Sequence, residues 1–258
     1  MAASKRWAYS TASQQQSDEA SDVELSYGKS LEAWEGFKGK VEHLIRDFDC
    51  KSICEIGGGA NPLLDSGVVK ASGIDYVVLD ISADELAKAP ADCRKIEADV
   101  CAEDFVGEGN VDFAFSKMLA EHVRDGKTFH SNVGKILRPG GIAFHFFPTL
   151  YAAPFIANKL LPETLADSIL DLVAPRNRYR QGKFKAYYSW CRGPTPPQLR
   201  RLQSVGFEIL EYKGFFGHEY YYQKIPPVSA MSRALTDVLI KHPNPYLTSF
   251  AYVVLRKK

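Results

Sequence analysis

Residues 51–64 read KSICEIGGGANPLL, and this stretch decides the fold of the chain. The apolar run SICEI is typical of a buried β-strand. The glycines at 57, 58 and 59 then supply a turn in which positive φ is cheap and no Cβ keeps a ligand away from the backbone. Asn61 and Pro62 have the pairing expected of a helix N-cap and a first helical position. We therefore predict a strand, a glycine turn and a helix whose N-terminus faces a nucleotide-type cofactor; a turn that only connects is the alternative.

The next strand strengthens the cofactor interpretation. Residues 75–82 read DYVVLDIS, a β-branched run that carries Asp80. This aspartate lies about twenty residues beyond the glycines, where a doubly wound sheet places the acid that binds ribose hydroxyls. A dinucleotide fingerprint needs a third glycine for helix packing, and this chain has Pro62 there. A nicotinamide cofactor is therefore the weaker candidate.

These motifs resemble those of the class I S-adenosylmethionine-dependent methyltransferases, in the subgroup with a small Rossmann-like catalytic domain. The first motif of that family, an acid followed by one residue and G-x-G, stands here as EIGGG at 55–59. Three further matches follow in family order: IEADVCAED at 96–104, VDFAFSKMLAEHV at 111–123 and ILRPGGIAFHFF at 136–147. The resemblance covers roughly residues 40–150, and more loosely the last sixty.

The resemblance implies S-adenosyl-L-methionine as cofactor, S-adenosyl-L-homocysteine as its product, and a role for each matching residue. It places Glu55, Gly57 and Gly59 at the methionine end, Asp80 at the ribose and Asp99 at the adenine amino group. Val100 would meet the adenine ring or its backbone edge. The full set of cofactor-binding residues that we expect is Glu55, Gly57, Gly58, Gly59, Asn61, Asp80, Ile81, Asp99, Val100, Ser116 and Lys117.

Methyl transfer needs few catalytic side chains, because the sulfonium already activates the leaving group. The protein has to align the acceptor, exclude water and accept a proton when the acceptor is a hydroxyl. A histidine has a suitable pKa for that step. The resemblance places His122 near cofactor and acceptor, and His145 lies in the following strand, within reach of the same pocket. For His122 the alternative is a hydrogen bond that orders the loop, and for His145 it is a histidine of the core.

Composition indicates an ordinary soluble globule. The 258 residues are 45% hydrophobic and 24% charged with a net charge of +1, which gives no global field for nucleic acid. Five cysteines lack paired C-x-x-C spacing and favour reduced thiols in the cytoplasm. No cluster has metal-ligand spacing, and Asp112 is interpreted as structural. No run is long and apolar enough for a membrane span, and no signal peptide is evident.

The predicted fold class is α/β: a Rossmann-like, seven-stranded, doubly wound sheet, mostly parallel with an antiparallel last strand. Residues 1–24, rich in Ser, Ala and Gln, are predicted to be a flexible tail, and 25–258 a single methyltransferase domain. Apolar positions at helical spacing predict a helix over 30–48. Two segments, at about 149–193 and 217–245, are additional to the strands and helices of this fold. We interpret them as a helical lid over the acceptor pocket.

The residues of the predicted lid should decide which acceptor binds, and their sequence indicates this acceptor only in part. Residues 176–190 read RNRYRQGKFKAYYSW and interleave cations with aromatic rings. Their cations suit a carboxylate or phosphate, a membrane surface, RNA or only solvent. We expect methylation of an O or N atom of a small molecule, with a natural product or lipid-like metabolite as candidates. The rivals are a nicotinamide-dependent oxidoreductase and a non-catalytic methyltransferase-like binding protein.

Overall fold

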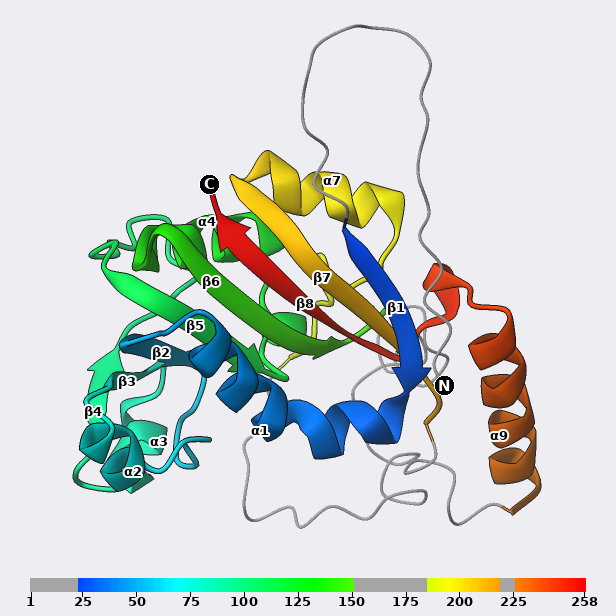
Figure 1. The fold of residues 1–258 in the computed structure, drawn as a ribbon, viewed down its shortest axis with the longest axis horizontal. Helices are drawn as coiled ribbons and strands as arrows, with labels where there is room; N and C mark the ends of the chain where they lie inside the picture. The colour runs from blue at the N-terminus through cyan, green and yellow to red at the C-terminus, as the bar shows by residue number, and fades with distance from the viewer. Residues whose placement is uncertain (1–22, 151–184, 219–225) are drawn as a thin grey trace, which may run out of the picture.

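The computed structural model describes residues 23–150, 185–218 and 226–258. Its strands form one eight-stranded sheet in the order β1-β7-β8-β6-β5-β2-β3-β4 (Figure 1). Every pairing is parallel except those of β8, which runs antiparallel to both β6 and β7. The strands are β1 Glu24–Lys29, β2 Ser52–Ile56, β3 Asp75–Asp80, β4 Arg94–Glu97, β5 Val111–Lys117, β6 Leu137–Pro148, β7 Phe207–Phe216 and β8 Phe250–Lys257.

Helices cover both faces of this sheet, as a doubly wound fold requires. On one face, Phe37 of α1 packs its ring against Phe115, Phe144 and Phe146. On the other face, Phe129 of α4 contacts His145 of β6. The helices are α1 Ser30–Asp47, α2 Ser66–Ala71, α3 Ala83–Lys88, α4 Gly126–Ile136, α7 Pro196–Ser204 and α9 Pro226–Lys241, with 3-10 turns η1 Ala120–His122 and η2 Pro245–Leu247. The predicted fold class and the helix over 30–48 are confirmed.

The sheet has one strand more than the seven predicted. We predicted the boundary between tail and domain at residue 24, which is where β1 begins. This strand pairs parallel with β7, from Glu24 beside Glu211 to Lys29 beside Phe216. Its six residues are too short for a clear pattern, and the strand exists because β7 offers a free edge. At this end of the sheet α9 lies beyond β1, whereas α2 and α3 lie at the opposite end, beside β3 and β4 (Figure 1).

The order of the strands fixes where a ligand can bind. The chain passes from β2 to β3 and β4 on one side, and then returns to place β5 on the other side of β2. Such a reversal opens a crevice at the carboxyl ends of the strands, here Ile56, Asp80 and Lys117. These are the ends at which the sequence motifs lie.

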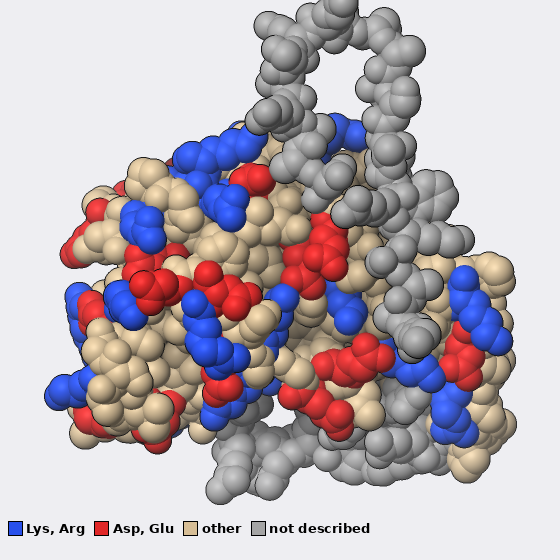
Figure 2. Space-filling view, in the orientation of Figure 1, with Lys and Arg blue, Asp and Glu red and all other residues tan. Residues whose placement is uncertain are grey.

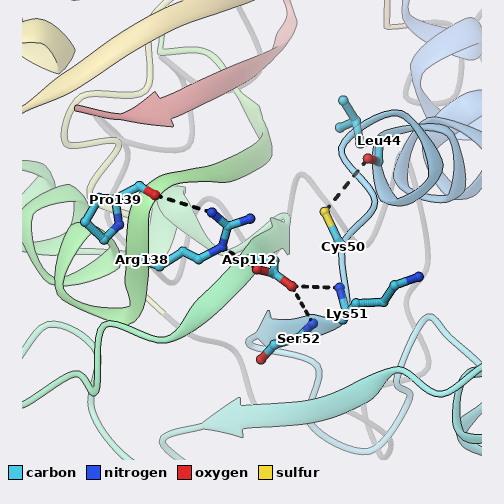
Figure 3. Close-up of polar contacts among 7 residues, drawn as sticks. All are labelled: Leu44, Cys50, Lys51, Ser52, Asp112, Arg138 and Pro139. Carbon is cyan, nitrogen blue, oxygen red and sulfur yellow. Dashed lines mark hydrogen bonds and ion pairs between the residues drawn. The ribbon is translucent and has the colours of Figure 1, made fainter.

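At the opposite end of these strands, where they start, Asp112 holds the backbone together, and its structural role is confirmed. One carboxylate oxygen accepts hydrogen bonds from the backbone N–H groups of Lys51 at 2.7 Å and Ser52 at 2.9 Å (Figure 3). The other accepts from Nε of Arg138 at 2.5 Å. Burial opposes ionisation, but these donors outweigh it and lower the pKa of Asp112. The carboxylate thereby joins the starts of β2, β5 and β6.

Several predictions concern residues that the structure does not describe. Residues 1–22 of the predicted tail, 151–184 of the first lid segment and 219–225 of the second lie outside the described residues. The described part of 217–245 contains α9 and η2, so a helix in that segment is confirmed. Within the described ranges, no helix combines the length and apolarity needed to cross a membrane. On the face in Figure 2, basic and acidic side chains are interspersed, as expected from the net charge.

Candidate active site

The glycine turn at the end of β2 is packed too closely for a side chain. Gly57 has φ of 77°, and a Cβ built on it would lie 2.3 Å from Cδ1 of Leu119. The N–H of Gly57 donates to the carbonyl of Leu79 at 2.7 Å, which fastens the turn to β3. A Cβ on Gly58 would lie 2.8 Å from Val78. Glycine is therefore required at 57 and 58 by the close packing of Leu119 and Val78 against the turn.

Glu55 holds the loop that follows this turn. The side chain is buried, and Oε2 accepts from the N–H of Leu63 at 2.9 Å and from the hydroxyl of Tyr76. Burial raises the pKa of Glu55, while both donors and the charge of Lys117 oppose that rise. We expected this carboxylate at the methionine end of the cofactor. In the structure the Glu55 carboxylate positions the loop that carries Leu63. Its partner Tyr76 was not predicted, because no local sequence pattern indicates this contact.

The predicted helix start at Asn61 and Pro62 is wrong. The helix begins at Ser66, and Asp65 is the N-cap, with its side chain accepting from the N–H of Val68 at 2.9 Å. The physical reason is the bond from Leu63 to Glu55, which holds the intervening residues as a loop. Asn61 donates its backbone N–H to the carbonyl of Gly58 at 3.1 Å, so it closes the glycine turn instead of capping a helix.

Asp80 stands at the end of β3 beside the glycine turn. Its Oδ1 accepts from the N–H of Ser82 at 2.9 Å, which orients the carboxylate. Its Oδ2 lies 3.2 Å from the position that a Cβ on Gly59 would occupy and accepts no hydrogen bond from the described residues. Ile81, next in the chain, is 58% exposed. A ribose diol and an apolar ring edge are the groups that such a pair of side chains suits.

A second carboxylate follows β4. Oδ1 of Asp99 accepts from the N–H of Cys101 at 2.8 Å. Asn132 of α4, buried on the inner face of that helix, donates to the carbonyls of Val100 and Ala102, both at 2.8 Å. This amide fixes the segment that carries Asp99. Sequence analysis missed Asn132, although a polar residue at a core position of a helix is a usable indication.

Ser116 and His145 lie in the core instead of in this crevice. They are partners across β5 and β6, and both are fully buried. The Nδ1 atom of His145 lies 2.8 Å from Oγ of Ser116, and its ring packs among Phe129 and His130. Burial lowers the pKa of His145 well below its usual value. This environment matches the core alternative weighed for His145, and it gives no support to a cofactor contact by Ser116.

Lys117, the last residue of β5, faces the other side of the sheet. Its Nζ lies 5.1 Å from the centre of the Trp34 ring and 5.0 Å from that of Phe37. Burial lowers the pKa of Lys117, and the charge of Glu55 opposes this. Trp34 is 41% exposed and packs edge-on against Phe146 and Phe250. The next residue, Met118, has φ of 54°, a costly conformation for a side chain with a Cβ.

His122 ends the 3-10 turn that follows. Nδ1 lies 3.1 Å from the carbonyl of Lys185, and Nε2 lies 3.8 Å from Oε1 of Glu121. Because a carbonyl only accepts, Nδ1 carries the proton of this bond, and Nε2 is the basic nitrogen of the neutral ring. Burial lowers the pKa of His122, which favours that neutral form. Glu121 is buried, and burial raises its pKa to about 8.

The residues at the crevice fit a nucleoside cofactor. The fit rests on a turn with positive φ at Gly57 and Gly59 at the switch point, and on Oδ2 of Asp80, which lies beside Gly59 and accepts no hydrogen bond from the described residues. Within the described ranges, no group of three His, Cys, Asp or Glu residues could hold a metal ion. The structure brings together Glu55, Gly57, Gly58, Gly59, Asn61, Asp80 and Lys117 around the switch point, with Asp99 after the neighbouring strand.

Comparison with known proteins shows which domain part of this chain resembles. Residues 55–145 match the model of the methyltransferase domain family. An uncharacterized protein of Mycobacterium tuberculosis strain H37Rv is 30% identical over 120 residues, 43% of this chain. That match spans only 40% of the relative's length. Residues 55–145 are thus similar to the methyltransferase domain, in agreement with the predicted resemblance.

Solved structures agree on the fold. Geranyl diphosphate C-methyltransferase of Streptomyces coelicolor is similar with a TM-score of 0.52 and 11% identity, over 88% of this chain and 82% of that one. Phosphoethanolamine N-methyltransferase 2 of Haemonchus contortus is similar with a TM-score of 0.51 and 14% identity, over 88% and 56%. Both were solved with S-adenosylhomocysteine. The fold is the Rossmann-like fold of S-adenosylmethionine-dependent methyltransferases.

Proposed function

We propose that this chain transfers a methyl group from S-adenosylmethionine to an O or N atom of a small molecule. The observation that carries the proposal is the crevice at the switch point, where the glycine turn ends beside Asp80, whose Oδ2 lies 3.2 Å from the Cβ position of Gly59. The match of residues 55–145 to the methyltransferase domain supports the same reaction. Bound S-adenosylmethionine would supply an activated methyl group on its sulfonium.

The residues of the chain then have separate tasks. Asp80 is oriented to accept both ribose hydroxyls, and Asp99 stands where it can accept from the adenine amino group. Glu55 and Asn132 touch neither group; they fix the two loops that present these contacts. The tasks that remain are alignment of the acceptor and removal of its proton.

His122 is our proposed base for a hydroxyl acceptor. Its Nδ1–H is engaged with the carbonyl of Lys185, so the proton would go to Nε2. With an acceptor found by screening, His122→Gln keeps a donor for Lys185 but removes the base, and kcat should fall by about 100-fold. Retention of activity by this variant would leave alignment alone as the mechanism, as for a neutral amine.

Cofactor binding tests the proposal directly. Calorimetry with S-adenosylhomocysteine should give saturable binding, and Asp80→Ala should cost about 2 to 4 kcal/mol, since each charge-assisted hydrogen bond contributes about 1.5 to 3. Asp84→Ala, in the first turn of α3, is the matched control because it also removes one charge from this end of the sheet. Binding of NADH with no binding of S-adenosylhomocysteine would favour the oxidoreductase instead. Cofactor binding without turnover of any acceptor would favour a binding protein.

A further inference from the structure

A second cavity lies on the face of the sheet that carries α4 and α7. Its volume is about 520 Å³, within the range of small-molecule sites. Three parts of the chain line it: the loop before α4, residues 185–192 and the middle of α7. The lining residues are Arg124, Lys185, Ala186, Tyr187, Tyr188, Ser189, Trp190, Arg192 and Arg201. We call this cavity the basic groove.

The basic groove is lined by cations and, among the described residues, by no acid. Within the described part of the chain, Arg124 and Arg201 form no ion pair, and Lys185 is engaged only with the ring of Tyr187, its Nζ 5.5 Å from the ring centre. The nearest acid in sequence, Asp125, caps α4 by accepting from Lys127 and Thr128. Three guanidinium groups and an ammonium therefore share one cavity, and for Arg124, Arg201 and Lys185 no acid among the described residues is a partner.

The wall of the groove is rigidly built. The N–H groups of Tyr187 and Tyr188 donate to the carbonyl of Glu121 at 2.7 and 3.0 Å. Nη1 of Arg192 donates to the carbonyls of Tyr188 and Cys191 at 2.8 and 3.0 Å. The Trp190 ring stacks on buried His130, with ring centres 5.8 Å apart. These bonds hold the segment against its own conformational strain.

That strain is concentrated in two residues of the wall. Tyr188 and Trp190 have φ of 52° and 59°, in the left-handed region that bulky side chains avoid. Strained non-glycine residues persist only where surrounding structure fixes them, and they cluster at functional sites. Here they turn aromatic side chains toward the cavity and the core beneath it. The basic groove is thus preorganised.

We propose that the basic groove binds a small anionic ligand that carries a phosphate or carboxylate on an aromatic or apolar group. Arg124, Arg201 and Lys185 receive the anion, and Tyr187 contacts the apolar part. The proposal does not depend on methyl transfer. It does link the groove to the candidate active site, because residues 185–188 are bonded to Glu121 and His122.

The test uses the full chain and phenyl phosphate as the probe. Calorimetry should show saturable binding that weakens by about tenfold in Arg124→Ala and in Arg201→Ala, because each removes a charge-assisted contact. Arg200→Ala is the matched control, since it removes the same charge from the adjacent position of α7 without touching the groove. Tyr187→Ala should abolish the preference for phenyl phosphate over inorganic phosphate. Melting temperatures equal to that of the wild type will show that the variants fold.

Each other outcome overturns the proposal. No saturable binding, or equal weakening by Arg200→Ala, would mean a diffuse basic surface. Binding to phosphatidylcholine vesicles doped with phosphatidic acid, lost in Arg201→Ala while phenyl phosphate does not bind, would assign the groove to a lipid headgroup. The same pattern with single-stranded RNA would assign it to nucleic acid. S-adenosylhomocysteine binding, measured in parallel, keeps failure of the groove distinct from failure of the proposed function.

Discussion

Replacement of Gly57 by alanine tests whether the glycine turn is required by steric contact as well as by backbone conformation. The φ of 77° costs an L-residue about 1 to 2 kcal/mol. The new Cβ would also lie 2.3 Å from Cδ1 of Leu119, closer than any real contact. Leu119 is half-buried, and moving its side chain away from the new methyl group costs about 1 to 3 kcal/mol more. We expect Gly57→Ala to lower the free energy of unfolding by about 2 to 5 kcal/mol.

Gly140 supplies the matched control. It has the same φ of 77°, but a Cβ there would meet nothing within 4 Å. Gly140→Ala therefore measures the cost of the backbone conformation alone. The difference between the two variants, about 1 to 3 kcal/mol, is the contact with Leu119. Urea denaturation with a shared m-value gives both free energies.

A double variant makes the same argument refutable. In Leu119→Ala the offending Cδ1 is absent, and the nearest remaining atom, Cβ, lies 3.5 Å from the new methyl, an ordinary contact. On that background Gly57→Ala should cost no more than Gly140→Ala, so the two substitutions should couple strongly. Equal losses for Gly57→Ala and Gly140→Ala in the wild-type background would refute the reasoning.

Three further predictions concern buried or half-buried charges. Asp112→Ala should lower the free energy of unfolding by about 2 to 4 kcal/mol in urea, because three donors lose their acceptor; a loss below about 0.5 would contradict the role of Asp112 as a clasp. Burial lowers the pKa of His130 to about 3, so between pH 6.5 and 3 only the unfolded chain takes up its proton and stability falls on acidification. His130→Asn should reduce that slope by about 1.4 kcal/mol per pH unit, and an unchanged slope would show that His130 protonates in the fold. The pH dependence that Glu121 contributes has the opposite sign, because its pKa of about 8 makes stability fall as pH rises from 4.5 to 8. Glu121→Gln should remove that fall, and a pH profile of stability parallel to that of the wild type would refute the prediction.

The part of the fold predicted from sequence is the part fixed by local patterns. The runs at β2 and β3 are continuous and apolar, and the glycines at 57–59 punctuate them, so strand, turn and the place of Asp80 follow directly. β1 was missed because its six residues become a strand only beside β7, far along the chain. The start of α2 was misplaced because Glu55 takes the N–H of Leu63, a tertiary bond that overrides the capping pattern.

The site divides in the same way. Asp80 and Asp99 could be placed because strand ends dictate where they stand. The burial of Ser116 and His145 could not be predicted, because the alternation of residues along a strand does not tell which face of the sheet is the core. Their pairing is visible only in the register of β5 and β6. The basic groove could not be predicted from the sequence, because its lining comes from three separate parts of the chain. These are the loop after η1, residues 185–192 and α7. The arginines at 176, 178 and 180, for which an anion, a membrane surface and solvent were left as alternatives, lie outside the described residues.

The pairing of β1 with β7 also bears on the order in which the molecule assembles. β2, β3 and β5 belong to neighbouring parts of the sequence and can pair soon after they are synthesised. β1 emerges before all of them, yet its partner β7 is among the last strands made. Closing so long a loop carries an entropic cost that only the finished sheet offsets. We therefore expect β1 to join the sheet late, and its amide hydrogens should exchange with solvent while those of β5 are still protected.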